Sequence, residues 1–301
     1  MKTRFFVAIA TLCFSLQLLA SWCPAQDDTA AAGKSFFWKV QGETGTAFIL
    51  GSVHLAKPDI YPLPKKIEDG FANSKILAVE ADPAKASDPA LMQQMLASAL
   101  YPGGDTLAQH ISKTTLELAA AEMNRLGLPM EAFESTKPWV LAVTIEALEF
   151  QRLGYNPAYG IDNYFAGKAS GKKRLVELES IDYQISLMNG FNEREQELFL
   201  IYTIRDLASL REGVGDLMHA WQKGDTKAME ALLNKSLTES PEIAPIYDKL
   251  FTRRNREMAE KIGQLLQGKE TAFVVVGAAH LVGKTGIIEL LRGKGFKIEQ
   301  M

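Results

Sequence analysis

The sequence predicts an α/β protein whose mixed sheet is built from both ends of the chain, with a large helical insertion at about residues 84–250. Short apolar runs of strand length cluster near the two ends, whereas the long middle consists of segments with helical periodicity. Several of the short runs contain no polar residue, as in residues 273–276, which is typical of strands that helices cover on both faces.

Six runs have the apolar and β-branched composition of strands. The first two are separated by residues 41–45, whose glycines predict a turn. The interval between the second and third runs has the length of a crossover helix, which a parallel pair of strands requires. The expected strands are residues 36–40, 46–50, 76–79, 174–178, 271–276 and 296–298.

The remaining segments are expected to be mostly helical. Pro138 suits the first position of a helix, where a backbone N–H is not needed. Gly213 and Gly215 are expected to interrupt the longest helix, because glycine disfavours helix interiors. The expected helices are residues 64–74, 91–100, 114–126, 138–153, 163–169, 192–223, 241–266 and 286–291.

Composition excludes several classes of protein. The 301 residues are 47% hydrophobic and 23% charged, which are the proportions of a globular protein and not of a disordered or multi-span membrane chain. The formal net charge is −3, so no basic excess attracts the chain to nucleic acid, and we expect no nucleic-acid partner.

The first 25 residues have the three parts of a secretory signal peptide. Lys2 and Arg4 supply a positive start, residues 5–20 are almost entirely apolar, and small residues precede a cleavage site after Ala25. A membrane anchor is the alternative, but the apolar stretch is short for a span and no second one follows. The sequence therefore predicts a signal peptide at residues 1–25, one domain at residues 26–301, and a periplasmic or secreted location with no stable membrane span.

Cleavage after Ala25 changes the chemistry available to the mature protein. It removes both cysteines, Cys13 and Cys23, and with Lys2 and Arg4 it changes the net charge from −3 to −5. A mature chain without thiols has no disulfide, no cysteine nucleophile and no cysteine-ligated metal.

Two of the four histidines stand in the same motif, Gly-x-x-His, directly after an expected strand. His54 ends the motif that begins at Gly51, and His280 ends the one that begins at Gly277. Glycine permits a sharp turn or a close approach at the strand end, and the crevice beyond the strand ends is where α/β sheets bind ligands. Either histidine alone is readily explained as structural, but the repeated motif favours a shared site.

Glu80 ends the third expected strand and is predicted to lie at the same edge of the sheet as the two histidines. Two imidazoles and a carboxylate form a nitrogen and oxygen set that suits Mn, Fe, Co or Zn and leaves positions open for water. A helix cap or a salt bridge is the alternative role for Glu80. His110 and His219 lack the preceding glycine and are expected to be structural.

Other polar residues are weaker candidates. Asp162 follows a glycine at the start of an expected helix and is explained equally well as its cap. Glu177 and Glu179 share one face of the fourth strand, where a solvated edge is favoured over a role beside the site. The basic run at residues 253–256 is usually a solvated helix face, although one arginine turned inward would bind a substrate carboxylate or an oxyanion.

Seven short motifs in a fixed order resemble the TraB/GumN (TraB/PrgY/GumN) family, which includes YbaP-type bacterial proteins and the animal TIKI proteases. The resemblance covers about residues 36–300. The motifs are residues 51–55 (GSVHL), 61–64 (YPLP), 79–82 (VEAD), 159–162 (YGID), 178–179 (LE), 254–255 (RN) and 277–281 (GAAHL).

The resemblance implies a fold similar to that of erythromycin esterases and ChaN proteins, with His54, Glu80 and His280 at its centre. It makes Arg254 a further catalytic candidate, with Asp162, Glu179 and Asn255 as residues that support the ligands. The TIKI proteins are membrane-tethered proteases that depend on Mn or Co, so Mn or Co is the metal that the resemblance favours, ahead of Zn or Fe.

The leading hypothesis is an exported metal-dependent hydrolase whose substrate is a peptide or a small molecule. His54 and His280 would bind the metal, with Glu80 as a ligand or base. One alternative is a non-catalytic protein that captures a peptide, haem or metal. Another is an esterase-like hydrolase that uses His54 as a general base without metal.

Overall fold

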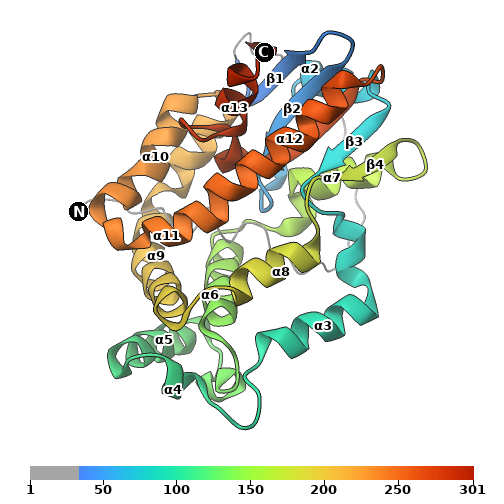
Figure 1. Cartoon of the computed structure of the whole chain (residues 1–301). Coiled ribbons are helices and arrows are strands. Elements are labelled where there is room, and N and C mark those ends of the chain that lie inside the picture. Colours follow the sequence, from blue (N-terminus) through green and yellow to red (C-terminus); the bar gives the residue numbers. More distant parts are fainter. Residues whose placement is uncertain (1–33) are drawn as a thin grey trace.

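A computed structural model describes residues 34–301 of the chain (Figure 1). The predicted signal peptide at residues 1–25, with both cysteines, lies outside these residues. Within the described part, no helix is both long enough and apolar enough to cross a membrane.

The described residues form an α/β fold around a six-stranded mixed sheet, which confirms the predicted fold class. β4, β3, β5 and β2 run parallel, whereas β1 pairs antiparallel with both β2 and β6. Strands from the two ends of the chain therefore lie side by side. In the order β4-β3-β5-β2-β1-β6, the strands are Arg174–Glu177, Ile76–Val79, Ala272–Gly277, Thr46–Ser52, Phe37–Gln41 and Lys297–Gln300.

Helices that are adjacent in sequence to the strands cover both faces of the sheet (Figure 1). Helix α12 (Arg254–Gln267) crosses one face, and α2 (Lys65–Ala72) and α7 (Ile161–Ala169) lie on the other. Beneath α2 and α7, aromatic rings from strands and helices pack together, and each such pair adds about 0.5–1.5 kcal/mol beyond the area it buries. These rings belong to Phe37, Phe48, Phe71, Phe165 and Phe273.

The expectation that the strands are covered on both faces is correct for the inner strands and wrong for the edges. Every residue of β3 and β5 is buried, whereas β4 and β6 are partly exposed. An edge strand has a neighbour on one side only, so fewer helices pack over it.

Between β3 and β5 the chain is helical apart from β4, which returns to the sheet. Helix α9 runs without a break through Gly213 and Gly215, so the expected interruption is wrong. Glycine costs about 1 kcal/mol per residue in a helix interior, and α9, which packs against α5, α6 and α10 along its 30 residues, accommodates that cost. The helices of this part are α3 (Pro89–Ala99), α4 (Leu107–His110), α5 (Lys113–Leu126), α6 (Pro138–Arg152), α8 (Ile181–Asn189), α9 (Glu193–Gln222), α10 (Thr226–Glu239) and α11 (Ala244–Tyr247).

The shorter elements connect these parts. Helix α13 (Ile287–Gly293) precedes β6, and a π-helical turn, η6 (Asp248–Arg253), leads directly into α12. The 3-10 turns are η1 (Pro58–Ile60), η2 (Pro83–Ser87), η3 (Met130–Phe133), η4 (Pro157–Tyr159), η5 (Pro241–Ile243) and η7 (Ala278–Leu281).

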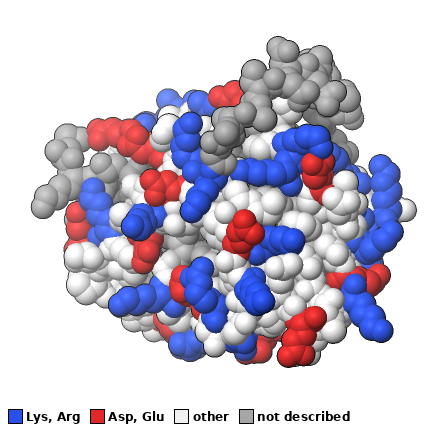
Figure 2. All heavy atoms as spheres, turned by 90° about the horizontal axis from the view of Figure 1, so that it is seen from above, with Lys and Arg blue, Asp and Glu red and all other residues white. Residues whose placement is uncertain are grey.

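Charges of both signs are interspersed on the face of the molecule that is seen from above (Figure 2). Seen from above, Lys and Arg side chains alternate with Asp and Glu, and neither sign gathers into one continuous patch on that face (Figure 2). This agrees with the nearly balanced composition.

One buried carboxyl group lies in the helical part, away from the residues singled out from the sequence. Glu146 of α6 is 2% exposed, and both of its carboxyl oxygens lack a hydrogen-bond partner among the described residues. Burial, and then the nearby charge of Asp206 on α9, raise the pKa of Glu146 well above 4.5. One turn later, Glu149 also suffers burial, but its hydrogen bonds to Arg211 and Arg125 lower its pKa overall.

These opposite shifts predict opposite effects of two matched substitutions. Glu146 binds its proton more tightly in the folded than in the unfolded chain, so stability falls as the pH rises from 4.5 toward the raised pKa. Glu146→Gln, which resembles the neutral acid, should therefore stabilise the protein at pH 7–8 by on the order of 1–3 kcal/mol and have little effect near pH 4.5. Glu149→Gln should destabilise it at neutral pH. Urea unfolding at several pH values measures both, and a destabilised Glu146→Gln variant at pH 8 contradicts the assignment.

Candidate functional site

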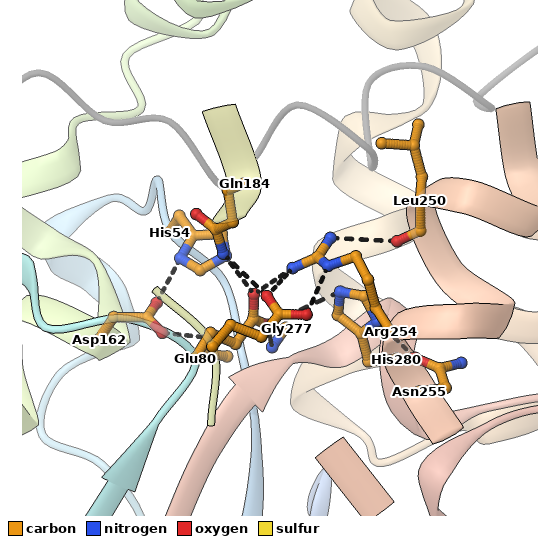
Figure 3. A network of polar contacts seen from close by, with 11 residues as sticks. His54, Glu80, Asp162, Gln184, Leu250, Arg254, Asn255, Gly277 and His280 are labelled. Atoms are coloured by element: carbon orange, nitrogen blue, oxygen red, sulfur yellow. Dashed lines mark hydrogen bonds and ion pairs between the residues drawn. The ribbon is translucent and has the colours of Figure 1, made fainter. Parts of the chain in front are cut away.

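The site is formed where three neighbouring parallel strands end. In the parallel register Ser52 of β2 lies opposite Gly277 of β5, so both Gly-x-x-His motifs leave the sheet at the same level. β3 pairs with the other side of β5, which brings Glu80 to the same edge. The structure thus places His54, Glu80 and His280 together, from segments far apart in the sequence (Figure 3).

The side chains of His54, Glu80 and His280 meet over the backbone of Gly277. A Cβ atom added to Gly277 would lie 3.2 Å from Glu80 Oε1, 3.4 Å from His280 Cδ2 and 3.7 Å from His54 Nε2. Gly51 is similarly confined, since a Cβ there would lie 2.4 Å from a ring carbon of Phe36. Neither glycine has a positive φ. The motif therefore needs glycine for close approach and not for a sharp turn.

Asp162 holds the imidazole of His54 in place. His54 Nδ1 lies 2.6 Å from Asp162 Oδ2, and Asp162 Oδ1 accepts a hydrogen bond from Ser52 Oγ at 2.9 Å. A carboxylate only accepts, so a neutral His54 that carries its proton on Nδ1 turns that N–H toward Asp162, and Nε2 is then the acceptor nitrogen. Asp162 is not the cap of α7, because Gly160 occupies the cap position.

Gly160 allows α7 to come close enough for this contact. A Cβ atom at Gly160 would lie 2.3 Å from the carbonyl oxygen of His54, a distance that side chains do not adopt. The next residue, Ile161, donates its N–H to the carbonyl of Val53 at 3.1 Å. The order Gly160, Ile161, Asp162 therefore seats the first turn of α7 directly against the strand end.

His280 is held by Asn255 in a matching way. Its Nδ1 lies 2.6 Å from Asn255 Oδ1, and the amide of Asn255 is oriented by donating Nδ2–H to the carbonyl of Thr285 at 2.9 Å. His280 therefore donates at Nδ1, and Nε2 faces Glu80 Oε1 at 3.8 Å. Burial lowers the pKa of His280 to about 3, against the attraction of Glu80, so this imidazole is neutral at neutral pH.

Glu80 is buried but ionised. It is 4% exposed, and burial alone would raise its pKa. His280, Arg254, His54 and the N–H of Gly277 outweigh burial and lower the pKa of Glu80 to about 2. Because His280 is neutral at neutral pH, Arg254 is the cation that keeps Glu80 ionised there. The Gly277 N–H donates to Oε1 at 2.6 Å, and Arg254 Nη2 donates to Oε2 at 2.8 Å.

Arg254 is the single inward arginine of the basic run, and it bridges two carboxylates. It donates to both oxygens of Glu179, at 2.8 and 2.7 Å, besides its bond to Glu80. Nη1 donates to the carbonyl of Leu250 in the π-helical turn at 3.1 Å. The solvated position favoured for Glu179 is therefore wrong: its side chain bonds to Arg254 of α12 and to Gln184 of α8 and is 1% exposed.

The site includes one residue that the sequence did not point to. Gln184 of α8 is 6% exposed and donates to Glu179 Oε2 at 3.1 Å and to Glu80 Oε2 at 3.5 Å. It carries no motif, and nothing in its sequence neighbourhood distinguishes it from other helical glutamines. A small cavity of 80 Å³ opens beside it, and the polar residues that line this cavity are His54, Glu80, Asp82, Asp162, Asn163 and Gln184.

The other candidates stay outside the site. His110 stacks on Tyr101 and lies 3.2 Å from Glu193, and His219 is exposed on α9. Glu177 forms an ion pair with Lys85 at the sheet edge. Neither His110 nor His219 lines the cavity beside Glu80.

The side chains as they stand do not form a ready metal cage. Among residues 34–301 no group of three or more His, Cys, Asp or Glu side chains is arranged to hold a metal ion. The types of donor nevertheless fit one: two imidazoles anchored at Nδ1 turn Nε2 toward one carboxylate, and metal-binding histidines are held in this way. A metal would have to compete with Arg254 and Gly277 for Glu80, because both already donate hydrogen bonds to its carboxylate oxygens.

Comparison with known proteins identifies relatives over most of the chain. The TraB/PrgY/gumN family model matches residues 36–300. An uncharacterized protein YbaP of Escherichia coli is 25% identical over 245 residues, which cover 81% of this chain and 87% of YbaP. An uncharacterized protein of Treponema pallidum is 22% identical and shares 85% of this chain and 80% of its own length.

More distant relatives carry a functional name. Metalloprotease TIKI1 of Danio rerio is 22% identical over 314 residues, which cover 88% of this chain and 63% of TIKI1. No solved structure matches the chain, so the expected likeness to erythromycin esterases and ChaN proteins stays a prediction.

The charge network predicts a large cost for removing its cation. Arg254→Met leaves Glu80 and Glu179 buried without their partner, which costs about 3–5 kcal/mol. The cost should shrink as the pH falls, because protonation neutralises the two carboxylates. Adding Glu179→Gln should recover part of the loss at neutral pH. Urea unfolding of the single and double variants measures this, and equal stability of wild type and Arg254→Met at pH 7 would contradict it.

Proposed function

Because the chain belongs to the TraB/PrgY/gumN family, we propose that it is an exported hydrolase that acts on peptides and uses a divalent transition metal. His54 and His280 would bind the metal through Nε2, with Glu80 as a third ligand or as the base. The convergence of these three groups over Gly277 is the observation that carries the proposal. The name of the TIKI1 relative supports metal-dependent proteolysis.

The surrounding residues would fix the geometry of both imidazoles. Asp162 and Asn255 would keep the proton on Nδ1, so that Nε2 would remain available as a donor of its lone pair. A bound metal would polarise the scissile carbonyl and lower the pKa of a water molecule. A set of two nitrogens and one carboxylate suits Mn or Co, accepts Zn or Fe, and disfavours Mg, which prefers oxygen ligands and its own water.

Glu80 would accept the proton of the attacking water. Its low pKa keeps it ionised at neutral pH, and Glu80 lines the cavity in which a substrate carbonyl would sit. Arg254 would act as a positioning residue for Glu80, since its guanidinium bonds to Glu80, Glu179 and Leu250. Glu179 and Gln184 would in turn keep Arg254 and Glu80 in position through their hydrogen bonds.

A second candidate function is supported by the same geometry. Asp162 orients His54 as a carboxylate orients the general base of many hydrolases, and Arg254 already supplies a cation to Glu80. In that case His54 Nε2 would take a proton from water directly, and an esterase-like reaction would proceed without metal. A chelator separates the two candidates.

Metal binding is expected to depend on both histidines. Isothermal titration of the mature protein with Mn²⁺ or Co²⁺ should show one site, and His54→Ala or His280→Ala should each weaken it at least tenfold. Glu80→Gln, which keeps the shape of the side chain, should weaken binding by an order of magnitude. His110→Ala, a histidine outside the site, is the matched control.

Hydrolysis of a peptide library should follow metal content. Activity should disappear with a chelator and return with Mn²⁺ or Co²⁺, and the double histidine variant should be no worse than either single one, because both act on one ion. Hydrolysis that resists the chelator but needs His54 would reject the metal and favour the general-base reaction. Stoichiometric capture of peptide or haem without turnover would favour a binding protein.

Export rests on residues 1–25 and is tested separately. We expect the mature protein to begin at Gln26, with a net charge of −5 and no cysteine. Mass spectrometry of the protein recovered from cell fractions reads its first residue. An intact Met1 in the mature protein would overturn the proposed export.

A further inference from the structure

The edge strand β4 presents an unused main-chain edge to its surroundings. Leu178 and Arg174 donate their N–H groups to the carbonyls of Val79 and Lys75, so the even-numbered residues of this segment bond to the β3 side. Strand geometry alternates, so the N–H and C=O groups of Leu175 and Glu177 point away from the sheet. β4 is last in the strand order, and no other strand of the described chain lies on that side.

A groove runs beside this edge. Its volume is 540 Å³, within the range of ligand pockets, and it lies between β4, helix α7 and the turns η2 and η4. The α7 side offers small residues, including Ala166, Gly167 and Gly171, so a main chain can come close. Leu175, 36% exposed, adds an apolar side chain.

The groove adjoins the small cavity beside Glu80. Asp82, Pro83 and Asn163 line both. The strands that carry the site and β4 are parallel, so a chain that follows β4 toward its carboxyl end reaches His54 and Glu80. A ligand lying in the groove would therefore lead into the site instead of past it.

The groove offers little charge for recognition. Two charged side chains line it, Asp82 and Lys173, and both are engaged within the protein. Asp82 Oδ1 accepts the N–H of Ala84 at 3.0 Å, and Lys173 Nζ donates to the carbonyl of Ser74. What remains for a ligand is the outward main chain of Leu175, continued along the edge by that of Glu177, with a small apolar lining.

We propose that this edge and groove bind the substrate as an extended peptide that adds a strand beside β4. The free N–H of Leu175 would pair with a peptide carbonyl, small or apolar side chains would fit against α7, and the chain would continue past Asp82 and Asn163 to the site. This inference rests on the proposed hydrolase, and it specifies the substrate as an unfolded or flexible segment recognised mainly through its backbone.

Leu175 provides a substitution that removes one main-chain donor. Leu175→Pro deletes the outward N–H and leaves the bonds to β3, because these belong to the even-numbered residues. Proline is tolerated at such positions of edge strands. Leu175→Thr is the matched control, since it removes the leucine side chain but keeps the N–H. Circular dichroism and thermal unfolding verify that both variants fold.

The test measures binding separately from catalysis. The background is the mature His54→Ala protein with chelator present, and the probe is the tightest binder from a fluorescein-labelled decapeptide library, followed by anisotropy. Leu175→Pro should raise the Kd of the probe about three- to tenfold above that of Leu175→Thr, because both variants lack the leucine side chain and differ by one main-chain hydrogen bond.

A second measurement leaves the protein unchanged. N-methylation of the probe at successive backbone nitrogens should weaken binding strongly at two nitrogens two residues apart and little at the nitrogen between them, because only alternate N–H groups of an added strand face the outward residues Leu175 and Glu177. A binding loss without this alternation, or equal binding by Leu175→Pro and Leu175→Thr, would overturn the docking mode. Because the background is inactive, these outcomes do not depend on hydrolysis. Peptide cleavage by wild type without alternation would reject the groove and retain the hydrolase, and an alternating pattern without cleavage would do the reverse.

Discussion

The parallel pairing of β2 with β5 is the constraint on which the rest of the site depends. It sets Ser52 opposite Gly277, so the two histidine motifs leave the sheet side by side although more than 200 residues separate them. Joining such distant segments costs little more entropy than joining nearer ones, because the cost of loop closure grows only logarithmically. Because β5 pairs with β2 on one side, β3 pairs with β5 on the other side, and this register brings Glu80 to the same edge of the sheet.

The buried charges couple the chemistry of the site to the fold. Glu80 and Glu179 tolerate burial because Arg254 lies between them, and Arg254 tolerates it because both carboxylates and the carbonyl of Leu250 accept its hydrogen bonds. A buried ion pair is weak evidence of stability, since desolvation offsets most of its attraction. Its effect here is on arrangement: β3, the end of β4, α8 and α12 must all be in place before the charges are satisfied.

The sequence revealed those parts of the site that depend on strand ends. Parallel strands end at one edge, so apolar runs and a repeated motif were enough to group His54, Glu80 and His280. The six strands were located within a few residues for the same reason. Asp162 was noted from the sequence as a candidate helix cap, but its role beside His54, like that of Asn255, came from the family resemblance, because these roles depend on which helix approaches which strand. Other features depend on tertiary contacts that leave no pattern in the local sequence. Gln184 enters the site because α8 packs beside the end of β4. The sequence of α8 resembles that of any other helix and does not predict this contact.

The cavity is large enough for the reacting group of a substrate but too small to recognise the substrate's side chains. At 80 Å³ it has room for a reacting group and a few water molecules, but not for several side chains. The polar groups around it, Glu80 and Gln184 among them, are already bonded to one another, so they are poorly placed to distinguish one substrate from another. Discrimination must then come from surfaces outside the cavity. A groove that recognises main chain would supply affinity for flexible segments in general, with side-chain choice left to its small apolar lining. The same three residues over Gly277 could therefore act on different substrates in proteins that share this site but differ along α7 and β4.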